Sequence, residues 1–553
     1  MSRELQPVLS KIRKSMADFL RRTSRLAAGF FFTLVIVIVT NCSQYKVTGK
    51  ELEYVPVTDN YRTYYEIFVG AFSDTNKDGI GDLNGVIKRM DYLNDGKPNS
   101  GKSLGVEGIW LMPVMPSPSY HKYDVTDYYA IDPQYGTMAD FDNLVAECNK
   151  RGIKLIIDLV LNHTSDRHPW FIKAKQAIKE GNLENRYAKY YAKETEEIPG
   201  KTWYKFEKTP DGTQYYYEGN FSNVMPELDM DNPDVLREIV DIVKFWLDKG
   251  VGGFRLDAVK FIYYGEDYRN IQFLKSFVDE CKKIKNDVYI VAENWSGVVT
   301  IQNYYEAVNC FDFGMAGTSG DIYYTAQGIE SVSEFTDRLA SYQRQVLGKN
   351  QQAILNPFIS NHDMDRAAGF LDVAEYKMYA AANLYMLSSG NPFIYYGEEI
   401  GMKGSRGNES TDANRRLAML WGDGDTVKDP EGSVYDRSKQ TNGTVKSQLP
   451  KKTSLLNHYK KLIRLRKANP EIARGVIVPL DFSQYTAFGG FVSDYNGSKV
   501  AVFHNTGENE ITVDLANYTN MNFSVLRGYA GKGKASLNGT LLTVSGYTSA
   551  VLK

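Results

Sequence analysis

Four acidic residues stand at the ends of separate short apolar runs in the sequence. They are Asp158, Asp257, Glu293 and Asp363. Burying a carboxylate is costly unless it is paired or hydrogen-bonded, so several carboxylates directed into one cleft are usually there for function. Taken singly, each is equally well explained by a salt bridge or a helix cap. As a set they indicate a functional site.

Other polar residues accompany these carboxylates. Asn162 and His163 follow Asp158, and Arg255 stands two residues before Asp257. Side chains along a strand alternate between faces, so Arg255 and Asp257 share a face, and a fixed cation there favours the ionised carboxylate. Repulsion between like charges makes a nearby Asp363 favour the protonated form of a second acid.

The elements that must position these residues alternate along the chain. Short apolar runs recur, most of them followed by a longer amphipathic segment, which is typical of a β/α alternation. Eight runs predict an α/β fold, a (β/α)8 TIM barrel, in which functional groups sit at the carboxyl ends of the strands. The runs are residues 64–72, 106–114, 153–163, 252–259, 288–295, 311–316, 353–363 and 392–401.

Two further regions depart from this alternation. The stretch after the third run is rich in Tyr, Trp, Lys and Glu and is too long for an ordinary loop, which indicates a small inserted subdomain. Near the C-terminus the pattern changes to alternating strands with Gly and Asn turns, which predicts an antiparallel β-sandwich. We expect the barrel over residues 61–163 and 231–460, the insertion over 164–230 and the sandwich over 469–553.

Four segments carry a family resemblance. Residues 158–163, 253–260, 292–295 and 360–363 resemble, in order and spacing, the four central motifs of the α-amylase family of glycoside hydrolases. The resemblance covers about residues 60–460. It implies that Asp257 attacks the anomeric carbon, that Glu293 is the general acid and base, and that Asp363 grips the sugar ring. Such a retaining mechanism needs two carboxyl groups roughly 5 to 5.5 Å apart.

The same resemblance implies a set of substrate-binding residues. Tyr123 resembles the ring that stacks under the reacting glucose, although Lys122 stands where the family commonly has Gly. His163 and His362 resemble the ligands of sugar hydroxyls, because a neutral imidazole can both donate and accept. The matching motifs also contribute Asp158, Arg255 and Lys260.

A loop after the first run predicts a metal site. Oxygen-bearing side chains alternate from Asp74 to Asp82 and glycines permit a tight turn, which is how Ca²⁺ collects oxygen ligands. The expected ligands are Asp74, Asn76, Asp78, Ile80 and Asp82. Gly85 occupies the twelfth position, where an EF-hand has Glu, and the loop resembles the calcium loop of oligo-1,6-glucosidases. The alternative is a solvated Asp/Asn turn.

The N-terminus predicts export. Seven Lys or Arg residues within the first 25 precede an uncharged run, Leu26 to Asn41, which is too short to favour spanning a membrane. The run ends at Cys42 and resembles a lipoprotein signal, with Asn41 as a departure. We expect residues 1–41 to be a signal peptide, Cys42 to carry a membrane lipid anchor, residues 42–60 to form a linker, and the protein to be a cell-membrane lipoprotein or extracellular. An uncleaved anchor is the alternative.

The composition, and one residue beside the proposed nucleophile, indicate which class of molecule the protein binds. A formal net charge of −2 gives no sign of nucleic-acid binding, and we expect a monomer acting on a neutral α-glucan. Ala258, directly after the proposed nucleophile, resembles the residue at this position in family members that act on α-1,4 bonds of maltodextrins. The alternatives are an α-glucosidase, a neopullulanase or a glucanotransferase, and, in another class, a non-catalytic amylase-like ectodomain anchored to a membrane.

Overall fold

The computed structural model describes residues 57–97, 100–407 and 411–553. The predicted signal peptide, Cys42 and nearly all of the predicted linker lie outside the described residues. Within the three described ranges, no helix is both long and apolar enough to cross a membrane. The export and lipidation predictions therefore stay predictions.

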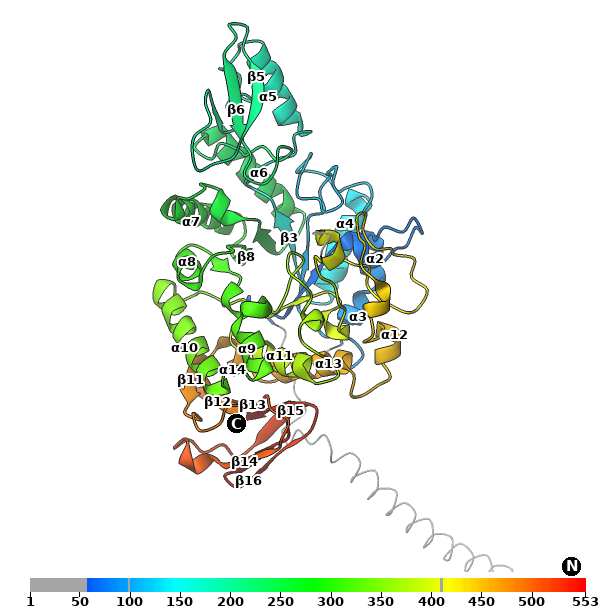
Figure 1. The fold of residues 1–553 in the computed structure, drawn as a ribbon, viewed down its shortest axis with the longest axis vertical. Helices are drawn as coiled ribbons and strands as arrows, with labels where there is room; N and C mark the ends of the chain where they lie inside the picture. The colour runs from blue at the N-terminus through cyan, green and yellow to red at the C-terminus, as the bar shows by residue number, and fades with distance from the viewer. Residues whose placement is uncertain (1–56, 98–99, 408–410) are drawn as a thin grey trace, which may run out of the picture. The chain divides into compact units, whose positions relative to one another are not determined.

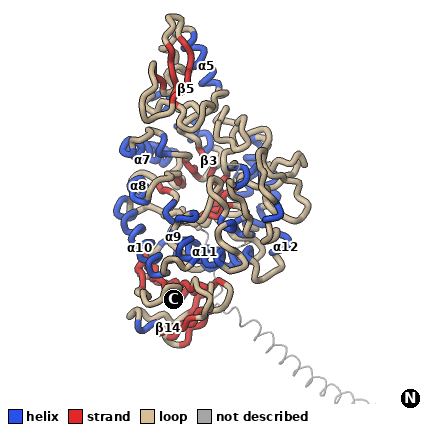
Figure 2. The backbone as a smooth tube through the Cα atoms, in the orientation of Figure 1, coloured by secondary structure: helices blue, strands red, loops and turns tan. Residues whose placement is uncertain are grey.

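A parallel sheet of seven strands forms the centre of the fold (Figure 2). Each strand is short and buried, as expected of strands covered on both faces. Its order in space is β10 (Phe393–Tyr395), β1 (Tyr64–Ile67), β2 (Gly108–Leu111), β3 (Lys154–Leu159), β7 (Gly253–Leu256), β8 (Tyr289–Ala292) and β9 (Asn309–Cys310).

An extended segment joins the two edges of this sheet. The predicted strand 353–363 is not assigned as a strand, but its backbone still bonds to both neighbours. The Asp312 N–H donates to the carbonyl of Asn356 over 3.1 Å, and the Phe393 N–H donates to the carbonyl of Pro357 over 3.0 Å. The predicted strand 311–316 is also wrong in place, because the sixth strand is β9, two residues upstream. The (β/α)8 fold itself is confirmed.

Helices surround the strands (Figure 1). Several begin at polar caps: Asn232 caps α6, and Thr137 with Asp140 forms a capping box on α4. Trp246 of α6 is buried against Phe141 of α4. The helices are α2 (Leu83–Lys88), α3 (Met90–Leu93), α4 (Met138–Lys150), α6 (Pro233–Asp248), α7 (Asp267–Ile284), α8 (Val298–Tyr304), α9 (Asp321–Gln327), α10 (Val332–Lys349), α11 (Lys377–Met386), α12 (Val445–Gln448), α13 (Leu455–Lys467) and α14 (Pro470–Arg474).

The long connection after β3 contains its own small sheet. Helix α5 (Pro169–Lys179) packs on β5 (Trp203–Lys208), which pairs with β6 (Gln214–Glu218), and β4 (Lys193–Glu194) pairs with the other edge of β6. The stacked rings of Phe171 and Phe206, with centroids 4.9 Å apart, join the helix to the sheet. The connection returns to the barrel through a bridge between His163 and Glu227.

The C-terminal region is built from two antiparallel sheets, as the sequence predicts. A buried apolar cluster that includes Phe482, Phe488, Val492 and Leu542 draws residues from both. The larger sheet has the order β11 (Val476–Leu480), β12 (Phe488–Tyr495), β13 (Ser498–Asn505), β18 (Thr548–Leu552) and β15 (Leu526–Gly531). The smaller has the order β14 (Ile511–Asp514), β17 (Leu541–Val544) and β16 (Ala535–Asn538).

Candidate active site

The ends of strands β3, β7 and β8 bring the central charged residues together. Asp158 in β3 and Arg255 in β7 are register partners in the sheet. Asp257 follows the end of β7, and its N–H donates to the carbonyl of Leu159 over 3.2 Å. Glu293 directly follows β8, and its N–H donates to the carbonyl of Leu256 over 2.9 Å. Neighbouring strands therefore fix each side chain.

One buried guanidinium contacts three of the carboxylates. Nη1 of Arg255 lies 2.9 Å from Oδ1 of Asp158 and 2.7 Å from Oδ1 of Asp257. Its Nη2 lies 2.7 Å from Oε2 of Glu293. Because Nη1 and Nη2 belong to one planar group, Asp257 and Glu293 are held side by side at the mouth of the barrel. The side chains of Asp257 and Glu293 each keep about 10% of their surface exposed, whereas that of Asp158 is wholly buried.

These surroundings shift the protonation of the buried acids. Burial raises the pKa of Glu293, and the negative charges of Asp257 and Asp363 raise it further against the opposing effect of Arg255. Burial also raises the pKa of Asp158 to about 7, although Arg255 opposes the shift. The arrangement therefore favours a protonated Glu293, which is the state that a general acid needs.

A second charged network surrounds Asp363. His362 is fully buried, with its Nδ1 2.5 Å from Oε1 of Glu66 and its Nε2 2.8 Å from Oδ2 of Asp363. Nη2 of Arg416 lies 2.6 Å from the other carboxylate oxygen of Asp363. Asp363 is therefore fixed by two cationic groups, while its side chain keeps 28% of its surface exposed.

His362 differs from the neutral ring expected from the sequence. Burial disfavours its charge, but the carboxylates of Asp363 and Glu66 raise its pKa to about 9. The same contacts lower the pKa of Asp363: burial opposes ionisation, but His362 and Arg416 outweigh it. With both ring nitrogens committed to carboxylates, His362 holds Asp363 in place.

Tyr123 connects the two networks. Its hydroxyl donates to Oδ2 of Asp158 over 3.1 Å and lies 2.6 Å from Nε2 of His362. Its ring is half-buried and stacks on the ring of His362, with centroids 5.6 Å apart. Lys122, which precedes Tyr123, has a left-handed backbone conformation with φ +69°, which Gly adopts without steric cost. A buried ion pair from Lys122 to Asp132, at 2.7 Å, anchors the lysine there.

Two other predicted binding residues lie beside this centre. His163 is buried, with its Nε2 3.2 Å from the carbonyl of Tyr123, and burial lowers its pKa, so the neutral ring expected there is favoured. Nζ of Lys260 is directed at the carbonyl of Trp295 and donates to it over 2.6 Å. Every predicted catalytic and substrate-binding residue therefore belongs to, or borders, one centre.

Comparison with known proteins assigns the chain that carries this centre to a family. The model of the α-amylase catalytic domain matches residues 66–475. The chain belongs to the α-amylase family. α-Amylase 3 of Dictyoglomus thermophilum is 37% identical over 460 residues, which cover 82% of this chain and 86% of that protein. An oligo-1,6-glucosidase of Parageobacillus thermoglucosidasius is 32% identical over 493 residues, covering 74% and 84%.

A solved structure agrees with this assignment. Amy13B of Eubacterium rectale superposes with a TM-score of 0.82 at 36% sequence identity, covering 91% of this chain and 97% of that one. Family membership makes the chain a glycoside hydrolase, with the proposed carboxylates at the barrel ends where such enzymes carry their active sites.

The carboxylates of the predicted calcium loop accept hydrogen bonds from backbone N–H groups. The carboxylate of Asp74 accepts from the N–H groups of Lys77 and Gly79, and that of Asp82 caps helix α2 through the Gly85 N–H. Across the described part of the chain, no three Asp, Glu, His or Cys side chains lie close enough together to hold a metal ion. The loop therefore offers oxygen donors of the kind that calcium takes, and its carboxylates are engaged here by backbone N–H groups.

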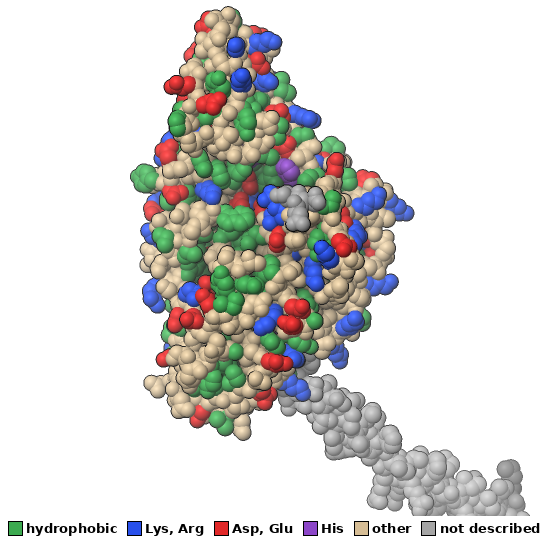
Figure 3. Space-filling view, viewed as in Figure 1, with side chains coloured by type: hydrophobic (Ala, Val, Ile, Leu, Met, Phe, Trp, Pro, Cys, Tyr) green, Lys and Arg blue, Asp and Glu red, His purple; other side chains and the backbone are tan. Residues whose placement is uncertain are grey.

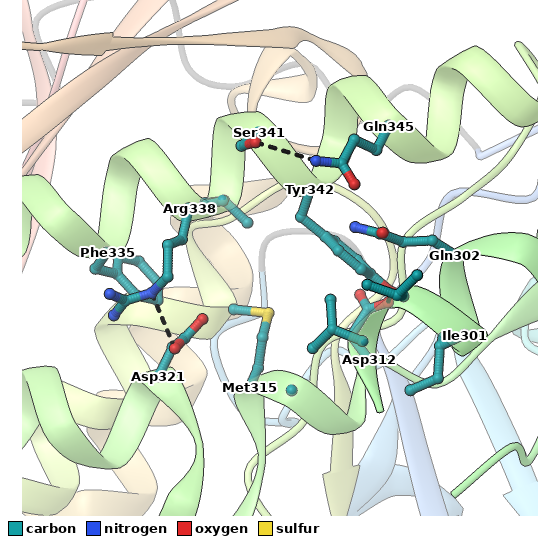
Figure 4. Close-up of a pocket in the computed structure, with 14 residues that line it drawn as sticks. Ile301, Gln302, Asp312, Met315, Asp321, Phe335, Arg338, Ser341, Tyr342 and Gln345 are labelled. Atoms are coloured by element: carbon teal, nitrogen blue, oxygen red, sulfur yellow. Dashed lines mark hydrogen bonds and ion pairs between the residues drawn. The ribbon is translucent and has the colours of Figure 1, made fainter. Parts of the chain in front are cut away.

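A separate cavity of about 320 Å³ lies between α8, α10 and the segment after β9 (Figure 4). Its walls are largely apolar, and Figure 4 shows Arg338 paired with Asp321 at its edge. Asp312 also borders it, but that carboxylate is satisfied by the hydroxyls of Tyr305 and Tyr342. The cavity holds none of the proposed catalytic carboxylates, so we assign it no part in the family's chemistry.

Three contacts in the centre were missed from the sequence. Glu66 was signalled only by its charge within an apolar run, and Arg416 lies in a loop without any pattern. The third is a backbone group: the N–H of Ala258, in a left-handed turn with φ +46°, donates to Oε2 of Glu293 over 3.1 Å. No sequence signal marks a backbone donor.

The contacts of His362 predict the pH at which its imidazole loses its proton. Glu66→Gln removes one of the two negative charges that hold the proton, so the pKa of His362 falls. We expect the imidazole of His362, followed by NMR, to titrate near pH 9 in the wild type and at lower pH in Glu66→Gln. The protonated ring also stabilises the fold below about pH 6.5, a contribution lost as pH rises through about 9.

The control is Glu306→Gln, which removes an exposed carboxylate. In this variant, the titration of His362 should match that of the wild type. An unchanged titration of His362 in a folded Glu66→Gln protein would show that Glu66 does not hold the proton.

Proposed function

We propose that the protein hydrolyses α-1,4-glucosidic bonds of starch-derived maltodextrins with retention of configuration. The observation that carries this proposal is the single guanidinium of Arg255, which contacts Asp257 and Glu293 at once. Retention needs a nucleophilic carboxylate and a protonated acid on opposite sides of one bond, close enough to act in turn. A shared cation supports that pairing.

The two chemical steps follow from these positions. Oδ of Asp257 forms a bond to the anomeric carbon while the bond from that carbon to the glycosidic oxygen breaks. The proton of Glu293 passes to the departing oxygen. In the second step Glu293, now ionised, takes a proton from water, whose oxygen displaces Asp257 from the sugar. Each residue ends in its starting state.

Three neighbours position the sugar in this proposal. Asp363 is partly exposed and held ionised by His362 and Arg416, so its oxygens can accept from sugar hydroxyls. The half-buried ring of Tyr123 offers an apolar face to the pyranose ring. Asp158, wholly buried and engaged by Arg255 and Tyr123, acts by fixing those two groups.

Ala258 supports α-1,4 bonds over α-1,6 bonds. It resembles the residue of α-1,4-acting members, and its left-handed backbone suits a small side chain better than a β-branched one. The names of the similar proteins include an α-amylase and an oligo-1,6-glucosidase, so α-1,6 cleavage is the second candidate. A non-catalytic ectodomain is disfavoured, because it has no use for the complete set of carboxylates.

Substitution of the proposed nucleophile tests the assignment. Asp257→Asn keeps the size of the side chain but removes the nucleophilic charge, so we expect kcat on maltoheptaose to fall by about 10⁴-fold or more. Early products of the wild type, read by NMR, should be α-anomers. The same assays on isomaltose decide between the two bond types.

A matched control is Asp142→Asn, which alters an exposed carboxylate on helix α4 and should retain wild-type activity. If the wild-type protein folds but turns over no α-glucan, the proposed function is wrong. If isomaltose is the better substrate, the enzyme is specific for α-1,6 bonds and not for α-1,4 bonds.

We further propose that Ca²⁺ binds the loop of Asp74, Asn76, Asp78, Ile80 and Asp82. The alternating oxygen donors and the left-handed turn at Gly79 support this. Because a ligand that binds only the folded state stabilises it, calcium at 100 times its dissociation constant should add about 2.7 kcal/mol and raise the melting temperature. Asp78→Ala should abolish the rise, whereas Asp142→Ala should preserve it. An identical rise in Asp78→Ala would place the ion elsewhere.

We also propose that the protein is exported and anchored to the cell membrane by a lipid on Cys42. The basic stretch, the uncharged run and the cysteine that ends it support this. Mass spectrometry of the mature N-terminal peptide should give a diacylated Cys42, and Cys42→Ala should release the protein from the membrane fraction. A mature chain that begins before residue 42 would favour the uncleaved anchor.

A further inference from the structure

A buried lysine directly precedes Tyr123, the ring that borders the active site. Figure 3 shows Lys and Arg side chains spread over the face of the molecule that it draws, whereas Lys122 has only 2% of its surface exposed. A lysine is almost never buried unless its charge is paired. Nζ of Lys122 lies 2.7 Å from Oδ2 of Asp132. It also donates to Oε1 of Gln134 over 2.6 Å and to the carbonyl of Ser117 over 3.4 Å. Three oxygen atoms therefore surround an ammonium that has three N–H donors.

The carboxylate that pairs with this ammonium is itself fixed by the backbone. Oδ1 of Asp132 accepts from the Gln134 N–H over 2.9 Å, and its Oδ2 accepts from the Ser117 N–H over 3.2 Å. Residues 112–137, which connect β2 to α4, contain no helix or strand. The contact between Lys122 and Asp132 therefore joins the two halves of a long connection that no ladder of backbone bonds holds.

The backbone at Lys122 directs two consecutive side chains to different parts of the molecule. Its left-handed conformation, φ +69°, is unfavourable for a residue with a Cβ, and such a conformation persists where the surroundings hold it. The side chain of Lys122 contacts Asp132. The hydroxyl of the next residue, Tyr123, lies instead 2.6 Å from Nε2 of His362 and donates to Oδ2 of Asp158.

We propose that Lys122 is a positioning residue of the active site, whose buried ammonium fixes the ring of Tyr123 in place before the sugar binds. A ring that is already ordered costs less conformational entropy on binding than one that the substrate must order. Glycine at position 122 would adopt the same backbone conformation without strain, but it would provide no ammonium to hold the connection. This inference rests on the proposed function, because it needs a sugar that binds against Tyr123.

A double-mutant cycle between Lys122 and Tyr123 tests this role. We expect Lys122→Met to lower kcat/KM on maltoheptaose by about tenfold, mainly through a higher KM, because a loosened ring loses its stacking contact with the sugar. In the Tyr123→Ala background no ring is left to position, so the same substitution should lower kcat/KM by at most about twofold more. A lysine with a merely structural role would lower kcat/KM by the same factor in both backgrounds.

A second variant covers the case in which Lys122→Met does not fold. The single substitution leaves the buried carboxylate of Asp132 without its cation, which is costly. Lys122→Met combined with Asp132→Asn removes both charges together, so this protein should fold and still show a loss of about tenfold in kcat/KM.

The matched control is Lys154→Met, which removes another buried lysine. The side chain of Lys154 is 8% exposed, and its Nζ lies 3.3 Å from Oδ2 of Asp287. Lys154 is the first residue of β3, at the opposite end of that strand from Asp158. Its loss should lower the melting temperature and leave kcat/KM unchanged.

The outcomes separate this role from the proposed function. If the folded wild type cleaves no maltoheptaose, the proposed function is wrong and the positioning role is wrong with it. If the wild type is active, an equal fall in both backgrounds, or an unchanged kcat/KM in folded Lys122→Met, would overturn the positioning role alone.

Discussion

The buried guanidinium of Arg255 is the contact on which the rest of the site depends. It is fully buried among Asp158, Asp257 and Glu293, and these carboxylates raise its own pKa well above the ordinary value although burial opposes its charge. Removing one member of such a cluster leaves an uncompensated buried charge, which is far more costly than the loss of an exposed ion pair. The cluster therefore fixes the positions of its side chains, even where its net contribution to the free energy of unfolding is small. Position is what a two-carboxylate mechanism requires.

The barrel is the means of assembling that cluster. Asp158 and Arg255 lie side by side because β3 and β7 pair in parallel register, and a shift of either strand by one residue would turn its side chain to the other face. Glu293 enters through the next strand, β8. A second group, from β1 and the closing segment, adds Glu66, His362 and Asp363, and the hydroxyl of Tyr123 contacts both groups. The hydroxyl of Tyr123 therefore links the two networks through direct contacts.

Around this buried centre, the connections between strands and helices add further residues. Phe221 comes from the long insertion and Phe261 from the turn after the proposed nucleophile, and their ring centroids lie 4.5 Å apart. A buried ion pair of Lys122 lets the chain carry lysine at a left-handed position before Tyr123. Loops that a fixed scaffold holds beside its catalytic groups are where substrate specificity usually resides.

The sequence alone was enough to predict the barrel, the C-terminal sheets and the grouping of Asp257, Glu293 and Arg255, because each of those residues lies in or directly after an apolar run and strand periodicity fixes its face. Alternation also predicted a calcium site in the loop from Asp74 to Asp82, which stays a prediction; in the fold, backbone N–H groups engage the carboxylates of Asp74 and Asp82. Glu66 and His362 are 296 positions apart, so only tertiary structure could reveal their contact and the charged imidazole that follows from it. The closing segment 353–363 needed the fold for the same reason, since it is held by bonds to distant neighbours and has no ladder of its own. Local pattern determines which residues can act; long-range contacts determine their protonation and partners.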